Sequence, residues 1–299
     1  SELPPDRRQL WHNPLTNESV FGLIAIEDAG APGIVVDGDG AEWDRAPAQV
    51  IHEATSGVRE VRAAKDASYL YLRLGVDEPQ AWTTAPLAIG FDLLPGGGGP
   101  FPDAAGIDPA ADTAVVIVGD EARAYVRASN DPNAVVYGKR PGFLSVDPVS
   151  LEPGSGVWNE QRLITNKPYT VPTTGERRPA EWFDLNPLRR GNSDPSRPDF
   201  DRRTIWAASG TTVELRIPHM VLGLSDPSSR QALLVRRGGA LDTVTADRVG
   251  ISVGLGAERQ GTRGYSWDTW NRVEWEERAK VGYDELVEVV RAVSQPTPR

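Results

Sequence analysis

Residues 69–76, YLYLRLGV, and residues 86–94, PLAIGFDLL, decide the fold. In both stretches an apolar side chain occupies every second position. The first set is Leu70, Leu72, Leu74 and Val76, and the second is Leu87, Ile89, Phe91 and Leu93. A period of two places such side chains on one face of a β-strand. The sequence therefore predicts two strands whose apolar faces belong to the same core.

Shorter apolar runs on both sides predict further strands. They include Val58–Ala64, Thr113–Val118, Ala122–Ala128, Val157–Ile164, Thr212–Ile217 and Val249–Val253. Gly, Pro and Asp between them are typical of turns. Strands do not alternate with long helices, so a parallel sheet is not indicated. We predict an all-β fold, an antiparallel and jelly-roll-like β-sandwich.

The sequence outside these strands has a different character. Residues 138–203 are rich in Pro and Gly, which predicts a long irregular insertion of the kind that often binds or docks. Near the end, Leu286, Val289, Val290 and Val293 follow helical spacing, so we predict a C-terminal α-helix that packs on the sandwich. Three parts are expected: 1–31, a linker or strand leading from a preceding region; 32–271, the sandwich with its insertion; and 272–299, the helix and tail.

The composition argues against several classes of function. The 299 residues carry a formal net charge of -10, so a polyanion would be repelled and nucleic-acid binding is not expected. There is no cysteine, which excludes disulfides, thiolate metal sites and a cysteine nucleophile. No run of 18 apolar residues is present, so no membrane partner is expected. Ser1–Leu10 is polar and unlike a signal peptide, and we expect that the chain was cut from a longer one.

Four segments, taken in order, carry a family resemblance. They are IVVDGDGAEWDRAP at 34–47, the acidic turn and Y-L-Y strand at 66–71, the strand between Trp82 and Asp92, and TTVELRIPHMVLGL at 211–224. The matching positions are Asp37, Gly38, Glu42, Trp43, Ala46, Asp66, Tyr69, Leu70, Tyr71, Trp82, Asp92, Glu214, Ile217, Pro218, Leu222, Gly223 and Leu224. Together they resemble family 9 carbohydrate-binding modules and their DOMON-like relatives, over about Ile34–Trp270. The flanks resemble sequence that follows the catalytic domain in large glycoside-hydrolase-like chains.

The resemblance implies a β-sandwich that binds the ends of glycans and is attached to a carbohydrate-active enzyme. In binding members, two tryptophans clamp the terminal sugar and calcium ions brace loops. The clamp positions match Trp82 and Trp267. Binding members also carry an acidic residue in the strand after the first tryptophan, whereas here that strand, PLAIGF, has no acid before Asp92.

The candidate ligand-binding residues are Trp82, Trp267, Trp270, Gln80 and Asp268. An indole ring stacks on the apolar face of a sugar, while Gln80 and Asp268 offer hydrogen bonds to hydroxyl groups. The alternative is that tryptophan fills the core, which we predict for Trp43 and leave open for Trp82. One or two tryptophans of the cluster Trp267, Trp270 and Trp275 are expected to anchor the last helix.

No catalytic or metal-binding pattern stands out. A glycosidase needs two placed carboxyl groups, but 42 Asp and Glu residues offer many pairs by chance. His12, His52 and His219 lack the spacing of metal ligands, and G-x-S-x-G is absent. The DGDG sequence at 37–40 lacks the spacing of a calcium loop. Calcium is therefore suggested only by the resemblance, as a structural ion.

Three hypotheses for the function follow. The first is a non-catalytic accessory module that binds glycan ends. The second is a structural domain that docks on a parent catalytic domain without binding sugar; the missing acid, the Trp-rich tail and the insertion favour it. The third is a stand-alone hydrolase. We expect no enzymatic activity and a glycan or the parent catalytic domain as partner. The compartment stays open, with an extracytoplasmic one favoured.

Overall fold

The computed structural model describes residues 9–13, 18–22, 33–137 apart from 97, 103 and 105, then 152, 154–236, 240–270 and 283–294. The chain divides into two compact units. One is Glu27–Trp270, and the other combines Ser1–Ile26 with Asn271–Arg299.

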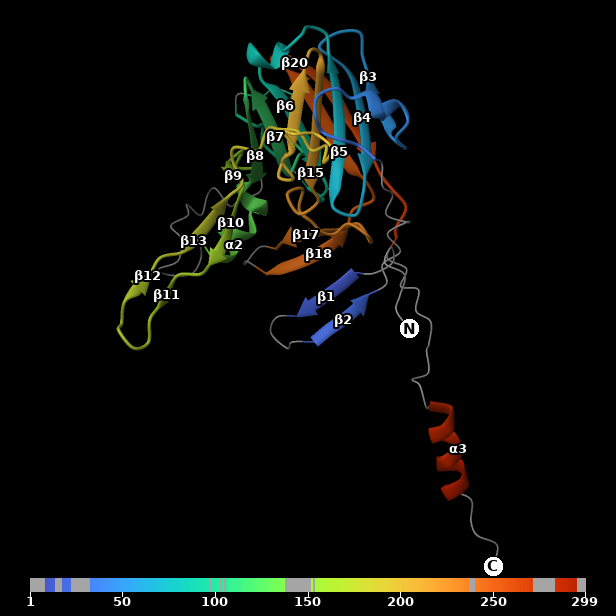
Figure 1. Ribbon diagram of the computed structural model, residues 1–299. Coiled ribbons are helices and arrows are strands. Elements are labelled where there is room, and N and C mark those ends of the chain that lie inside the picture. Colours follow the sequence, from blue (N-terminus) through green and yellow to red (C-terminus); the bar gives the residue numbers. More distant parts are fainter. Residues whose placement is uncertain are drawn as a thin grey trace, which may run out of the picture. The chain divides into compact units, whose positions relative to one another are not determined.

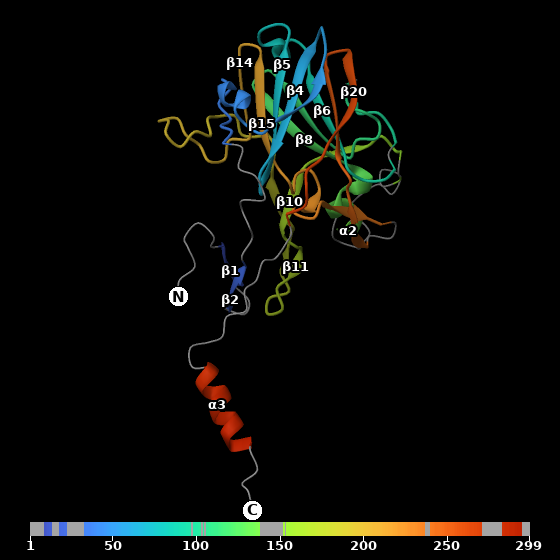
Figure 2. The ribbon, with the colours of Figure 1, turned by 90° about the vertical axis from the view of Figure 1, so that its right-hand side faces the viewer.

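The larger unit is an antiparallel β-sandwich, so the predicted all-β fold class is confirmed (Figures 1 and 2). The first sheet has the order β14-β15-β5-β4-β3 and the second β20-β19-β6-β7-β8-β9. The strands of the first sheet are β3 (Gln49–Glu53), β4 (Val58–Lys65), β5 (Tyr69–Val76), β14 (Trp206–Ser209) and β15 (Thr212–Pro218). Those of the second are β6 (Leu87–Asp92), β7 (Thr113–Val118), β8 (Glu121–Arg127), β9 (Trp158–Glu160), β19 (Val249–Leu255) and β20 (Glu258–Tyr265).

The core lies between these two sheets. Both period-two sets predicted from the sequence belong to one cluster of buried side chains. Leu70, Leu72, Leu74 and Val76 on β5, and Leu87, Ile89 and Phe91 on β6, are 0% exposed, and Leu93 is 8% exposed. The prediction that these two strands share a core is therefore confirmed. The same cluster includes inward side chains of β4, β7, β15 and β19.

Loops cover part of the outer face of each sheet. On the first sheet, Val36 and Trp43 pack on the outward side chains of Ala64 and Tyr71. Trp43 lies in the short 3-10 helix η2 (Ala41–Asp44) and is 1% exposed, so its predicted core position is confirmed. On the second sheet, residues Ala104, Ile107 and Ala111 of the loop before β7 cover Ala88 and Ala114.

The insertion contains more regular structure than the sequence predicts. β10 (Arg162–Asn166) pairs with β13 (Glu181–Asp184), and β11 (Tyr169–Thr170) pairs with β12 (Arg177–Arg178). These four strands form a β-ribbon arm, residues 162–184 (Figure 1). Most of the side chains in this arm are exposed. The prediction of an irregular insertion is wrong for this stretch, because the strands pair only with each other and lack the buried face that a period of two would reveal.

Smaller elements gather at one end of the sandwich. A third sheet consists of β16 (Leu224–Asp226), β17 (Gln231–Val235) and β18 (Leu241–Thr245). The helix α2 (Pro132–Tyr137) follows the 3-10 helix η4 (Ala128–Asn130), close to the end of β8. At the opposite end, η3 (Ala81–Thr83) links β5 to β6.

The smaller unit contains a hairpin and a helix. β1 (Gln9–Asn13) pairs antiparallel with β2 (Glu18–Gly22), and α3 spans Tyr283–Ser294. The predicted C-terminal helix is therefore confirmed, whereas Trp275 lies outside the described residues. Leu286, Val289, Val290 and Val293 are between 54% and 81% exposed. Their packing on the sandwich stays a prediction. Among the helices that the structure describes, none has the length and apolarity that crossing a membrane requires.

Candidate functional site

Trp82 does not offer an exposed ring for a sugar. It lies in η3, is 2% exposed and belongs to the main core cluster. Gln80, in the left-handed region at φ 56, precedes it, and its own side chain is exposed. The prediction of Trp82 as a sugar-stacking residue is therefore wrong. The large apolar ring closes one end of the core, where its burial stabilises the fold.

Trp267 and Trp270 belong to an aromatic cluster instead of an open platform. Trp267 is half-buried, its Nε1 donates to the carbonyl of Pro227 at 2.9 Å, and its ring centroid lies 5.8 Å from that of His219. Trp270 is 3% exposed, with the Nζ of Lys65 3.7 Å from its ring centroid. The rings therefore have partners inside the protein.

The two predicted clamp residues lie at opposite ends of the sandwich. Trp82 follows the end of β5, whereas Trp267 packs on His219, whose backbone N–H donates to the carbonyl of Ser68 just before β5 begins. The eight residues of β5 span about 25 Å. Gln80 and Asp268 are both exposed, but Gln80 lies at the end of Trp82 and Asp268 at the end of Trp267, so the length of β5 separates them too. The clamp that the resemblance implies is therefore not formed.

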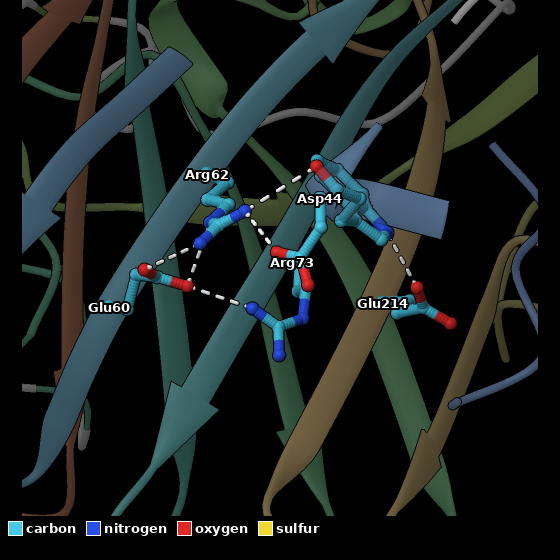
Figure 3. Close-up of polar contacts among 6 residues, drawn as sticks. Asp44, Glu60, Arg62, Arg73 and Glu214 are labelled. Carbon is cyan, nitrogen blue, oxygen red and sulfur yellow. Dashed lines mark hydrogen bonds and ion pairs between the residues drawn. The ribbon is translucent and has the colours of Figure 1, made fainter. Parts of the chain in front are cut away.

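A buried glutamate joins the DGDGAEW segment to the first sheet (Figure 3). Glu214 on β15 is 0% exposed. Its carboxylate accepts hydrogen bonds from Trp43 Nε1 at 2.6 Å and from the backbone N–H groups of Gly38 at 2.7 Å and Asp37 at 3.2 Å. Burial raises the pKa of Glu214 to about 7, while the three donors act in the opposite direction. The geometry is that of a structural anchor, because all three donors come from the segment that the carboxylate holds.

An ion-pair network lies next to this anchor. Figure 3 shows Arg62 and Arg73 reaching the carboxylate of Glu60 from neighbouring strands, at 2.9 Å and 2.8 Å. Arg62 also reaches Asp44 of η2 at 2.9 Å. These contacts fasten η2 to β4 and leave no pair of carboxylates facing across a cleft. We therefore assign the network to structure and not to catalysis.

The described residues enclose a cavity of about 100 Å³, which we call the end cavity. It lies between the ends of the two sheets, at the end away from Trp82. Thr113 and Val126 of the second sheet, with Leu93 just after β6, form one wall. Val221, Leu222 and Ala232 form another, and the partly exposed side chains of Met220 and Leu163 stand at the mouth.

Amide side chains connect the walls of the end cavity. Gln161 precedes the β-ribbon arm, and its Nε2 donates to the carbonyl of Val221 at 2.7 Å. Asn133 of α2 donates from Nδ2 to the carbonyl of Arg162 at 3.0 Å. These bonds join segments of the lining that are 29 and 60 residues apart in the sequence.

Asp112 is one of two buried acidic groups that line the end cavity, and the other is Asp131. Asp112 is 4% exposed, and its carboxylate accepts the backbone N–H groups of Leu93 and Leu94, each at 2.8 Å, and the amide of Asn130 at 2.7 Å. Burial raises the pKa of Asp112 to about 7, and the backbone hydrogen bonds partly offset this. With three donors already in place, this carboxylate joins the two ends of the loop between β6 and β7.

The described residues do not fit a calcium site. In the DGDG loop, Asp37 Oδ1 already accepts the backbone N–H of Asp39 at 2.8 Å, which is a turn contact. Among the residues that the structure describes, no three His, Asp or Glu side chains are grouped so that they could hold a metal ion. The suggestion of calcium is therefore not pursued.

Sequence reasoning missed the end cavity. Its walls come from the start of the loop after β6, from β7, β8, α2, β10 and β17, and from the turn at 220–223, so no local pattern marks it. A signal did exist for Glu214, because a charged residue inside the apolar strand TVELRIP is expected to have buried partners.

The chain was compared with protein-family models, with curated proteins and with solved structures, and none of these comparisons gave a match. The resemblance to family 9 carbohydrate-binding modules therefore stays a hypothesis.

Proposed function

We propose that this chain is a non-catalytic binding domain that holds a small, mainly apolar ligand in the end cavity. The observation that supports it is a cavity of about 100 Å³ with largely apolar walls, placed where the core between the sheets ends. A concave apolar site with a few polar groups is the usual form of a small-molecule site. The accessory, non-catalytic role expected from the sequence is kept, and binding in the end cavity replaces sugar stacking on Trp82 and Trp267.

The size of the end cavity limits its ligand. A cavity of about 150 Å³ lined by apolar side chains holds benzene. With its open mouth, the end cavity suits a molecule of about six to eight non-hydrogen atoms. The binding free energy of such a small ligand is expected to be about -4 to -5.5 kcal/mol, which corresponds to a Kd of about 0.1–1 mM.

Toluene and benzyl alcohol test this proposal. Added to the chain, they are expected to shift the NMR signals of the methyl groups of Leu93, Val126 and Leu222, which line the cavity. Ala232→Leu places three more carbon atoms in the cavity and should abolish these shifts. Ala240→Leu, at an exposed position, should leave them unchanged.

Ala232→Leu crowds a buried position and is expected to cost about 1–3 kcal/mol, so its fold is checked by circular dichroism. Leu163→Asn at the partly exposed mouth gives a second variant, expected to weaken binding several-fold. Absence of shifts in the wild type, or binding that both variants leave intact, would contradict the proposal.

A second candidate function, docking on a parent catalytic domain, is favoured by the β-ribbon arm. Leu163 and Phe183 face each other across β10 and β13, and they are 37% and 55% exposed. Tyr169, farther along the arm, is 49% exposed. Apolar and aromatic side chains held exposed on a regular element are typical contact points for another protein. The partner that we propose is the catalytic domain of the enzyme that the resemblance implies.

Calorimetry with that catalytic domain, taken from the same reading frame, tests the docking. Phe183→Ser combined with Tyr169→Ser is expected to weaken binding about tenfold or more, because aromatic anchors dominate such interfaces. Val118→Ser is a matched control, since Val118 is 49% exposed at the opposite end of the sandwich. Equal affinity of the double variant and the control would count against docking through the arm.

A further inference from the structure

Strand β7 places Thr113 in the wall of the end cavity. Ile117 and Val115 are buried between the sheets, and Thr113 continues the same inward row, because side chains two positions apart lie on one face of a strand. Opposite Thr113 in the sheet are Phe91 and Val126. Thr113 lines the end cavity together with Val126. A polar group thus stands where the row otherwise has branched apolar side chains.

The Thr113 hydroxyl has no hydrogen-bond partner in the part of the chain that the structure describes. Thr113 is 5% exposed, and its buried Oγ1 makes no hydrogen bond to any residue that the structure describes. A hydroxyl buried without a partner costs free energy. Valine has nearly the same shape and would avoid this cost, so the fold of the described residues gives no reason for threonine at this position.

The neighbouring polar side chains are already paired. The carboxylate of Asp112 accepts three hydrogen bonds, and the amides of Gln161 and Asn133 donate to backbone carbonyls. Among the described side chains that line the cavity, the Oγ1 of Thr113 is the buried polar atom without a hydrogen-bond partner.

We propose that the end cavity takes a neutral ligand with an apolar body and one hydroxyl group, which bonds to Thr113 Oγ1. This inference rests on the proposed function and adds the chemistry of the ligand's polar end. Two hydroxyl groups can each donate to or accept from the other, so one contact satisfies both. A carboxylate is disfavoured by Asp112 and Asp131, two buried acids that line the same cavity, whereas the cation that lines it, Arg162, already stacks on Trp182 with 3.8 Å between its Cζ and the ring centroid. An ammonium group is disfavoured as well, because it has three hydrogen-bond donors and Thr113 Oγ1 can accept from only part of them.

Four molecules with the same ring provide the test: benzyl alcohol, toluene, benzylamine and benzoate. Each is titrated into the whole chain at pH 7 and followed by NMR. Benzyl alcohol is expected to bind more tightly than benzylamine and benzoate. Thr113→Val should weaken benzyl alcohol about three- to tenfold, the value of one hydrogen bond, and should leave toluene unchanged or slightly tighter. Thr83→Val is the matched control, because the Thr83 hydroxyl donates to the Gln80 carbonyl at the far end of the sandwich.

The outcomes separate this inference from the proposed function. If Thr113→Val changes benzyl alcohol and toluene binding by the same factor, or if benzoate or benzylamine binds best, the hydroxyl contact is overturned while the cavity remains a binding site. If none of the four molecules binds, both proposals fail. Thr113→Ser keeps the hydroxyl and should retain benzyl alcohol binding, whereas Thr113→Ala should lose it, so the test does not depend on the folding of one variant.

Discussion

Glu214→Ala is expected to lower the melting temperature of the chain by about 6–12 °C. The change removes the acceptor of three hydrogen bonds, from Trp43 Nε1 and from the backbone N–H groups of Gly38 and Asp37. Each buried donor left without a partner costs about 1–3 kcal/mol, and part of this returns because the carboxylate is no longer buried. A net loss of about 3 kcal/mol corresponds to this shift for a unit of this size.

Thermal unfolding followed by circular dichroism measures the effect. Glu214→Gln keeps an oxygen that can accept from Trp43 and should cost about 1 kcal/mol. Glu121→Ala is the control, because Glu121 forms an exposed ion pair with Arg123 and such pairs contribute little. If Glu214→Ala melted within a degree or two of Glu121→Ala, the anchor role assigned to Glu214 would be wrong.

As the pH rises from about 4 to 7, the wild-type chain is expected to lose stability relative to the variants Glu214→Gln and Asp112→Asn, whose amide side chains cannot ionise. The pKa of Glu214 is raised from 4.5 to about 7 in the folded state, and that of Asp112 from 3.8 to about 7. A raised folded-state pKa means that the folded chain binds the proton more tightly than the unfolded chain. The stabilisation from each proton is therefore complete below about pH 4 and lost by about pH 7, on the order of 3–4 kcal/mol for each group.

Denaturant unfolding of wild type, Glu214→Gln and Asp112→Asn at pH 4.5, 5.5, 6.5 and 7.5 tests this. Burial lowers the pKa values of His52 and His219, and this raises stability as the pH rises toward 6.5. That contribution is common to all three proteins and cancels in the difference between wild type and each variant. A difference that stays constant from pH 4.5 to 7.5 would refute the protonation of the two buried carboxyl groups in the folded chain.

The strands of the core could be predicted because their burial has a period in the sequence. β5 and β7 lie at the predicted boundaries, Tyr69–Val76 and Thr113–Val118, since an apolar side chain at every second position leaves little choice of face. β20 has no such pattern. β20 lies at the edge of the second sheet and buries few of its side chains. It is held by backbone pairing with β19, and its sequence, ERQGTRGY, has no alternating apolar residues from which a strand could be predicted.

The candidate site was much less predictable. Trp82 stands among polar residues in the sequence, yet its ring is buried, because burial depends on what the fold brings over it and not on its neighbours along the chain. The end cavity depends on the relative placement of both sheets, α2 and β17. The family resemblance indicated Trp82 and Trp267 as clamp residues, but it could not show that they lie at opposite ends of the sandwich.

The contact between Trp43 and Glu214 also bears on how the chain folds during synthesis. The two residues are 171 positions apart, and β5 has β15 as a neighbour from the same late part of the sequence. At about 5–20 residues per second, a ribosome needs roughly 10–30 s between these two residues. Throughout that interval the Nε1 of Trp43 lacks its acceptor Glu214, and one edge of β5 lacks its neighbour β15. The first third of the protein is therefore expected to emerge as a client for chaperones, and the sandwich to close only after β15 has left the ribosome.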